Sequence, residues 1–110
     1  MKYLLIVRSE EPAPEAEPVS PAGCEGWSED LEQRGKLLAG GILRPSRHGV
    51  TVQVREGRAL RTDGPFTETK EMIAGFNLLE CESMEEAAEI ASRHPVARTG
   101  AIEIRAIWET

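Results

Sequence analysis

The stretch Met72–Ala91, MIAGFNLLECESMEEAAEIA, predicts a strand followed at once by a helix. Residues 72–81 carry apolar side chains on both alternating faces, which is typical of a central strand. Ser83 and Glu86 form a capping box, in which the serine oxygen accepts a hydrogen bond from a free helix amide and the glutamate reaches back. The helix behind this box has a stripe of apolar residues at helical spacing: Met84, Ala87, Ala88 and Ala91. We therefore expect the helix to pack closely on a sheet.

A β-hairpin is predicted upstream of this unit. Apolar and polar residues alternate from Val50 to Glu56, which places three valines on one face of a strand. Glu56–Arg58 has the composition of a tight turn, and residues 59–61 return as the second strand.

The flanking segments supply the remaining elements. Residues 2–8 are a short apolar run that indicates a strand. Residues 25–39 have helical periodicity, and Gly40–Gly41 is the predicted stop because glycine accepts the left-handed cap conformation. Residues 42–44 begin a second strand that Pro45 limits, and residues 100–108 alternate as a last strand.

The order of these elements is β-α-β-β-(β)-β-α-β. It predicts a ferredoxin-like α+β sandwich, with an antiparallel sheet and both helices on one face. A chain of 110 residues corresponds to a single domain, here residues 1–110. Because strands with apolar residues on both faces need cover on both, we expect a homodimer packed sheet to sheet.

The net charge of the chain argues against nucleic acid as a partner. The chain has 13 Lys and Arg against 19 Asp and Glu, for a net charge of −6, so a uniformly acidic surface would repel phosphates. Aromatic residues make up 5 %, too few for a base-stacking surface. We therefore expect no direct nucleic-acid binding. The charge is uneven, however, because residues 9–33 carry −8 and residues 34–61 carry +6.

Targeting and metal signals are weak. The first apolar run is five residues long, shorter than the core of a signal peptide, and no stretch approaches the ~20 apolar residues of a membrane span. We expect a cytoplasmic protein in which Cys24 and Cys81 stay reduced.

Neither the cysteines nor His48 and His94 have metal-ligand spacing, so no metal and no cofactor are predicted.

Residues 63–76, DGPFTETKEMIAGF, carry a family resemblance. The stretch resembles the DGPF subgroup of the YCII-related family of small bacterial proteins. Further positions sit in the order expected of that family: Met1–Leu5, Trp27, Gly41, Leu43, Pro45, Glu86–Ala87, Ala91, Gly100 and Glu103–Arg105. The resemblance spans nearly the whole chain and predicts a single YCII-like domain.

The resemblance implies a dimeric α+β barrel of ferredoxin-like protomers, with a cleft between sheet and helices and the DGPF loop near its mouth. It implies no settled reaction. More distant relatives of this architecture include enzymes that act on lactones and other compact organic substrates. Some DGPF proteins are linked to alternative sigma factors, which suggests a regulatory setting.

The DGPF segment supplies most of the candidate site residues. Asp63 is either a turn residue or a carboxylate that acts as a general base or orients a ligand. Phe66 is predicted to anchor the loop and to lie at the site. Glu68, Lys70 and Glu71 form either an ion-pair network or a cluster that raises the pKa of one carboxyl group.

Three residues outside that segment complete the candidate site. Arg44 and His48 lie in the loop before the hairpin, within a run of arginines that is either a solvated face or an anion site, because guanidinium groups bind carboxylates with two parallel hydrogen bonds. Trp27 is either a core residue or a ring that stacks on a ligand.

Three functional hypotheses remain open on the sequence. The first is an enzyme acting on a small, anionic organic substrate, with Asp63 as base or orienting group and Arg44 or His48 holding the substrate. The second is a non-catalytic or regulatory module that binds a metabolite in the same place, and it is favoured because no nucleophile or cofactor motif is evident. The third is a structural dimer without a ligand.

Overall fold

A computed structural model describes residues 1–10, 24–64 and 72–109 of the chain. The elements of the described part are β1 Lys2–Ser9, α1 Cys24–Gln33, β2 Leu37–Ile42, the 3₁₀ turn η1 Ser46–His48, β3 Val50–Arg55, β4 Arg58–Asp63, β5 Met72–Glu80, α2 Met84–Ser92, the 3₁₀ turn η2 Pro95–Arg98 and β6 Ala101–Ala106.

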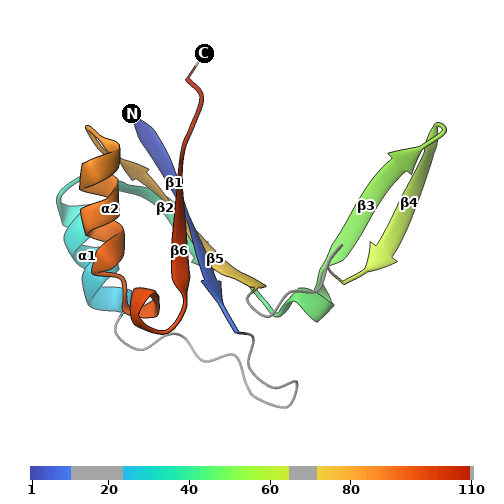
Figure 1. Cartoon of the computed structure of the whole chain (residues 1–110), viewed down its shortest axis with the longest axis horizontal. Coiled ribbons are helices and arrows are strands. Elements are labelled where there is room, and N and C mark those ends of the chain that lie inside the picture. Colours follow the sequence, from blue (N-terminus) through green and yellow to red (C-terminus); the bar gives the residue numbers. More distant parts are fainter. Residues whose placement is uncertain (11–23, 65–71, 110) are drawn as a thin grey trace.

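Four strands form the main sheet, in the order β2-β5-β1-β6, with antiparallel neighbours throughout. The helices α1 and α2 lie together on one face of this sheet (Figure 1). The fold is therefore α+β, as predicted. With the β3–β4 hairpin set aside, the β-α-β-β-α-β order is that of a ferredoxin-like domain.

The core lies between the sheet and the helices. Along β1, Tyr3, Leu5 and Val7 are buried, whereas Leu4 and Ile6, which point to the opposite face, are half-buried. The buried cluster combines strand and helix residues: Tyr3, Leu5, Leu31, Leu79, Cys81, Ala87, Ile90 and Ala91. These side chains occupy the space where the family resemblance implied a cleft.

The predicted helix over residues 25–39 is wrong in its last third. The helix α1 ends at Gln33, and Gly35 adopts a positive φ of 70° just after it. Residues 37–42 form β2 instead, because they pair with β5 along the edge of the sheet. The Gly40–Gly41 pair, predicted as a helix stop, lies inside this strand, where a Cβ on Gly40 would come within 2.7 Å of the Asn77 amide nitrogen.

The capping box of α2 is confirmed. The Ser83 hydroxyl oxygen accepts a 3.2 Å hydrogen bond from the backbone N–H of Glu86. The packing stripe is corrected in part, because Ala87, Ile90 and Ala91 are buried whereas Met84 and Ala88 are exposed. The helix thus faces the sheet through Ile90 rather than through its first residue.

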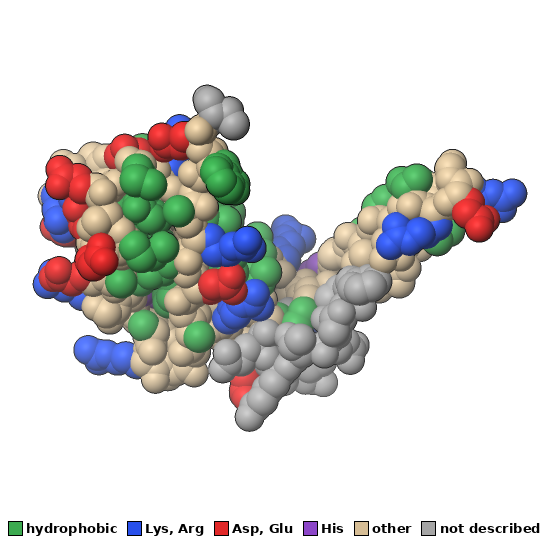
Figure 2. Space-filling model, turned by 45° about the horizontal axis from the view of Figure 1, so that its top comes forward, with side chains coloured by type: hydrophobic (Ala, Val, Ile, Leu, Met, Phe, Trp, Pro, Cys, Tyr) green, Lys and Arg blue, Asp and Glu red, His purple; other side chains and the backbone are tan. Residues whose placement is uncertain are grey.

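The predicted β-hairpin is confirmed as β3–β4, but it is a separate two-stranded sheet. Its turn places Glu56 and Gly57 at positive φ, 53° and 76°, as a two-residue hairpin turn requires. The hairpin projects from the body of the molecule (Figures 1 and 2). The radius of gyration is accordingly 15.7 Å, whereas a compact chain of this length has about 13 Å.

Candidate functional site

Hydrogen bonds close the base of the hairpin at a corner formed by Gly49, Asp63 and Gly64. Val50 pairs with Asp63 across the two strands, and beyond that pair the backbone N–H of Gly64 donates a 2.8 Å hydrogen bond to the carbonyl oxygen of Gly49. The Thr51 hydroxyl donates a 2.7 Å hydrogen bond to the carbonyl oxygen of Gly64. Gly64 has a φ of 88°, so the glycine predicted at this turn is required by the backbone. Asp63 is exposed at this corner.

The turn η1 brings positive charge to the same corner. Pro45 precedes it, and the backbone N–H of His48 bonds to the Pro45 carbonyl oxygen at 2.9 Å, which closes one 3₁₀ turn. Arg47 and His48 occupy the last turn, directly before Gly49. Arg44 stands in an exposed position just before Pro45. A cationic turn therefore abuts the strand end that carries Asp63.

Arg44 and His48 lie in the segment that leads into the hairpin, and Asp63 is the last residue of its second strand. Trp27 lies on α1 instead. The other four residues predicted from the DGPF segment, Phe66, Glu68, Lys70 and Glu71, lie outside the described residues.

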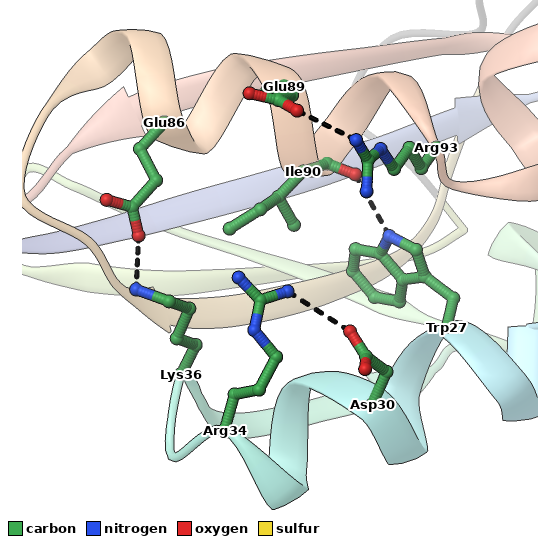
Figure 3. Close-up of polar contacts among 8 residues, drawn as sticks. All are labelled: Trp27, Asp30, Arg34, Lys36, Glu86, Glu89, Ile90 and Arg93. Atoms are coloured by element: carbon green, nitrogen blue, oxygen red, sulfur yellow. Dashed lines mark hydrogen bonds and ion pairs between the residues drawn. The ribbon is translucent and has the colours of Figure 1, made fainter.

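Trp27 lies elsewhere, on α1 beneath α2. Its indole Nε1 donates a 2.9 Å hydrogen bond to the carbonyl oxygen of Ile90, as Figure 3 shows. Its ring also meets the imidazole of His94 edge to face, with centroids 4.7 Å apart. Trp27 thereby joins the two helices on the far side of the sheet from its open face.

His94 is a buried polar residue whose role the sequence suggested only in part. At the end of a helix and before Pro95, a charged imidazole that interacts with the helix dipole is the expectation from the sequence alone. The side chain is instead 6 % exposed, and its Nδ1 accepts a 3.1 Å hydrogen bond from the backbone N–H of Val96. Burial lowers the pKa of His94, because it disfavours the charged form. His94 is thus a cap of η2, and its pairing with Trp27 has no signal in the local sequence.

The sequence matches the YCII-related domain over residues 1–110. The chain belongs to the YCII-related family. This confirms the family predicted from the DGPF stretch, while the assignment to the DGPF subgroup stays a prediction.

Two known proteins are similar to this YCII-related chain, one in sequence and one in structure. An uncharacterised protein of Rhizobium meliloti (strain 1021) is 37 % identical to it over 75 residues, which cover 66 % of this chain. The match spans about 60 % of that relative's length. The 5-chloro-2-hydroxyhydroquinone dehydrochlorinase of Burkholderia phenoliruptrix AC1100, solved in complex with 2,5-dihydroxybenzoquinone, has the same fold: the TM-score is 0.55 at 19 % identity, covering 100 % of this chain and 96 % of that one.

One ion pair of this YCII-related protein links the helix layer to the sheet. Lys36 and Glu86 form an ion pair between the start of β2 and α2 (Figure 3), which raises the pKa of Lys36 and lowers that of Glu86. Cys81 is buried beside this pair, and desolvation raises the pKa of its thiol. A raised pKa disfavours the thiolate, so Cys81 is suited to packing rather than to nucleophilic chemistry.

Across residues 1–10, 24–64 and 72–109, no three His, Cys, Asp or Glu side chains come together as a metal site would need. Within the same ranges, no helix is long and apolar enough to span a bilayer.

Proposed function

We propose that this protein binds a small anionic organic molecule at the hairpin base, in a non-catalytic or regulatory role. The observation that carries the proposal is the 2.8 Å bond from the Gly64 N–H to the carbonyl oxygen of Gly49, the residue that directly follows η1. It ties the end of a turn that contains Arg47 and His48 to the first two residues of the DGPF stretch.

The chemistry of these side chains favours an anion. Residues 44–63 carry five arginines against Glu56 and Asp63, in a chain whose total charge is −6. Guanidinium groups bind carboxylates in two parallel hydrogen bonds, and the exposed Arg44 is placed to do so from the edge of the corner. The dehydrochlorinase has the same fold and was solved in complex with 2,5-dihydroxybenzoquinone. That complex supports the proposal that this fold can bind a compact oxygenated molecule.

Thermal unfolding with and without a probe anion tests the proposal. We expect succinate or 2,5-dihydroxybenzoquinone, present at about ten times its Kd, to raise the Tm by roughly 5 °C. Sodium chloride at equal ionic strength should not do so. The shift should disappear in Arg44→Ala and persist in Arg98→Ala, which removes an exposed arginine from η2 instead. Equal shifts in both variants would contradict a site at the hairpin base.

An enzyme is the second candidate, because Asp63 is exposed on the corner that η1 also reaches. As a general base or orienting group it would act on the same class of ligand. Asp63→Asn should then abolish turnover of a substrate without lowering the Tm. If the wild-type protein binds the ligand but does not turn it over, the non-catalytic role stands.

A homodimer is part of the proposal. One face of the main sheet has no helix on it, and its centre is apolar: Leu4, Ile6, Phe76 and Leu78. We call these four residues the open face. A second copy that covers it would form the dimeric α+β barrel predicted above. Light scattering should therefore give twice the 12.1 kDa of one chain. A dimer with no response to any anion would favour the purely structural role.

A further inference from the structure

We propose that the β3–β4 hairpin is an arm that packs on a second copy of this chain. We call residues 50–63 the arm. The inference rests on the homodimer proposed above, and it names the segment that holds the two copies together. It is independent of the anion site at the base of the arm.

The arm lacks the packing that a hairpin needs. A two-stranded hairpin on its own is marginally stable at best in water. The core cluster formed by the described residues contains no residue of the arm. Val52 and Val54 are each 61 % exposed, although valine in a strand usually packs against a neighbouring surface. A partner surface would supply the missing contacts.

One side of the arm carries its three valines and Ala59, together with the charged residues Arg61 and Asp63. Residues paired across the two strands share a face, and the pairs Val50–Asp63, Val52–Arg61 and Val54–Ala59 alternate with more polar pairs. We call Val50, Val52, Val54 and Ala59 the valine face. The reverse side has one large apolar residue, Leu60, among polar and charged ones: Thr51, Gln53, Thr62 and the arginine pair of the tip, Arg55–Arg58. The valine face is thus the side that gains most from burial.

The open face of the sheet is the complementary surface. Four residues lie in a row across its strands, one from each: Glu103, Ile6, Phe76 and Gly41. Phe76 is 37 % exposed in the middle of this row, and the missing side chain of Gly41 leaves the flank of its ring uncovered. Strands of six residues are about 20 Å long and four strands span about 14 Å, so the arm is long enough to cross the row.

The valine face and the open face can contact each other only between two copies of the chain. In one chain the arm points away from the sheet, and the valine face and the open face stay apart (Figure 1). The segment that leads through η1 to the arm leaves β2 at Ile42, next to Gly41 at the end of the row. Around a two-fold axis, each copy can lay its arm at the Glu103 end of the row of the other, beside the part of the open face that the partner's sheet covers. Such an exchange is self-complementary and closed, as a symmetric dimer requires.

Charge favours the same exchange. The arm, residues 50–63, has a net charge of +1, and the rest of the chain has −7. An arm that meets the body of another copy therefore brings opposite charges together, which assists association and makes it sensitive to salt. The hydrophobic and basic side chains of the arm are both visible in Figure 2.

Sedimentation of two matched variants tests the arm. Val52→Asp puts a charge on the valine face, and Gln53→Asp puts the same charge on the next residue, which faces the other way. We expect the wild-type protein to be a dimer at about 10 µM and Val52→Asp to weaken the dimer at least tenfold, while Gln53→Asp changes it less than threefold. Circular dichroism of each variant checks that the fold is retained.

The possible failures are distinguishable. A wild-type protein that stays monomeric at about 100 µM overturns both the dimer and the arm. A dimer that neither variant weakens leaves the proposed dimer intact and overturns the arm. Equal weakening by both variants contradicts the assignment of the valine face.

Cross-linking between copies tests the target surface. A chain with Val52→Cys is mixed with a differently tagged chain with Glu103→Cys, and a short bismaleimide is added. We expect a cross-link between the two tags, stronger than with Gln53→Cys in place of Val52→Cys. Cys24 and Cys81 are present in both mixtures, so they contribute an equal background. Equal yields from the two mixtures would contradict docking of the valine face at this row.

Discussion

The rings of Trp27 and His94 meet edge to face, with their planes at 71° to each other. This contact joins the first helix to the residue that caps η2 after the second helix, 67 positions later in the chain. Together with the bond from the indole to Ile90, it connects the helix layer above the sheet. The residues that secure the fold are thus distinct from those at the hairpin base, and they can be tested separately.

Trp27→Phe should lower the free energy of unfolding by about 1–2 kcal/mol, measured by urea denaturation. The substitution removes the donor to the Ile90 carbonyl and part of the ring contact with His94. Trp108 is the matched control, because it is 94 % exposed. Trp108→Phe should change stability by less than about 0.5 kcal/mol. Equal losses in the two variants would show that the helix contact contributes nothing.

Burial of His94 makes stability depend on pH. Its pKa is lowered in the folded protein from the ordinary value of 6.5, so below that pH the unfolded chain binds more protons. The stabilisation is present above pH 6.5 and is lost as the pH falls towards the folded pKa, at no more than about 1.4 kcal/mol per pH unit for one proton.

His94→Asn isolates this contribution. The asparagine oxygen can accept from the Val96 N–H as Nδ1 does, but it does not titrate. We expect the difference in unfolding free energy between pH 7.5 and 5.5 to be smaller in this variant than in the wild type. His48→Asn, at an exposed position, should retain the wild-type difference. An unchanged difference in His94→Asn would refute the effect.

Two glycine substitutions should have opposite signs. A Cβ on Gly100 would lie 2.2 Å from the Arg8 carbonyl oxygen, so Gly100→Ala must separate β6 from β1 and should cost about 2–3 kcal/mol. A Cβ on Gly26, in α1, would meet nothing within 4 Å. Gly26→Ala should therefore raise stability by about 0.5 kcal/mol, because alanine loses less backbone freedom in a helix. Chemical denaturation measures both, and a stable Gly100→Ala would disprove the close approach.

Local sequence patterns were sufficient to predict several helices and strands. The capping box of Ser83 and Glu86 predicted the start of α2, because the bond between them spans three residues. The alternation from Val50 onwards predicted the hairpin, since its turn needs only residues 56 and 57 at positive φ. The DGPF stretch was enough to recognise the family.

The sequence by itself therefore determined the elements whose stabilising contacts are short-range, the α+β class and the family. Tertiary structure decided the rest. Residues 37–42 became a strand because β5 offered an edge to pair with, a contact about 37 residues away that helical periodicity does not contain. The same pairing left the hairpin outside the main sheet, and packing of the helix layer placed Trp27 on His94 rather than beside Asp63. These outcomes depend on contacts between distant segments, whose energies exceed the weak local preferences that a sequence pattern reports.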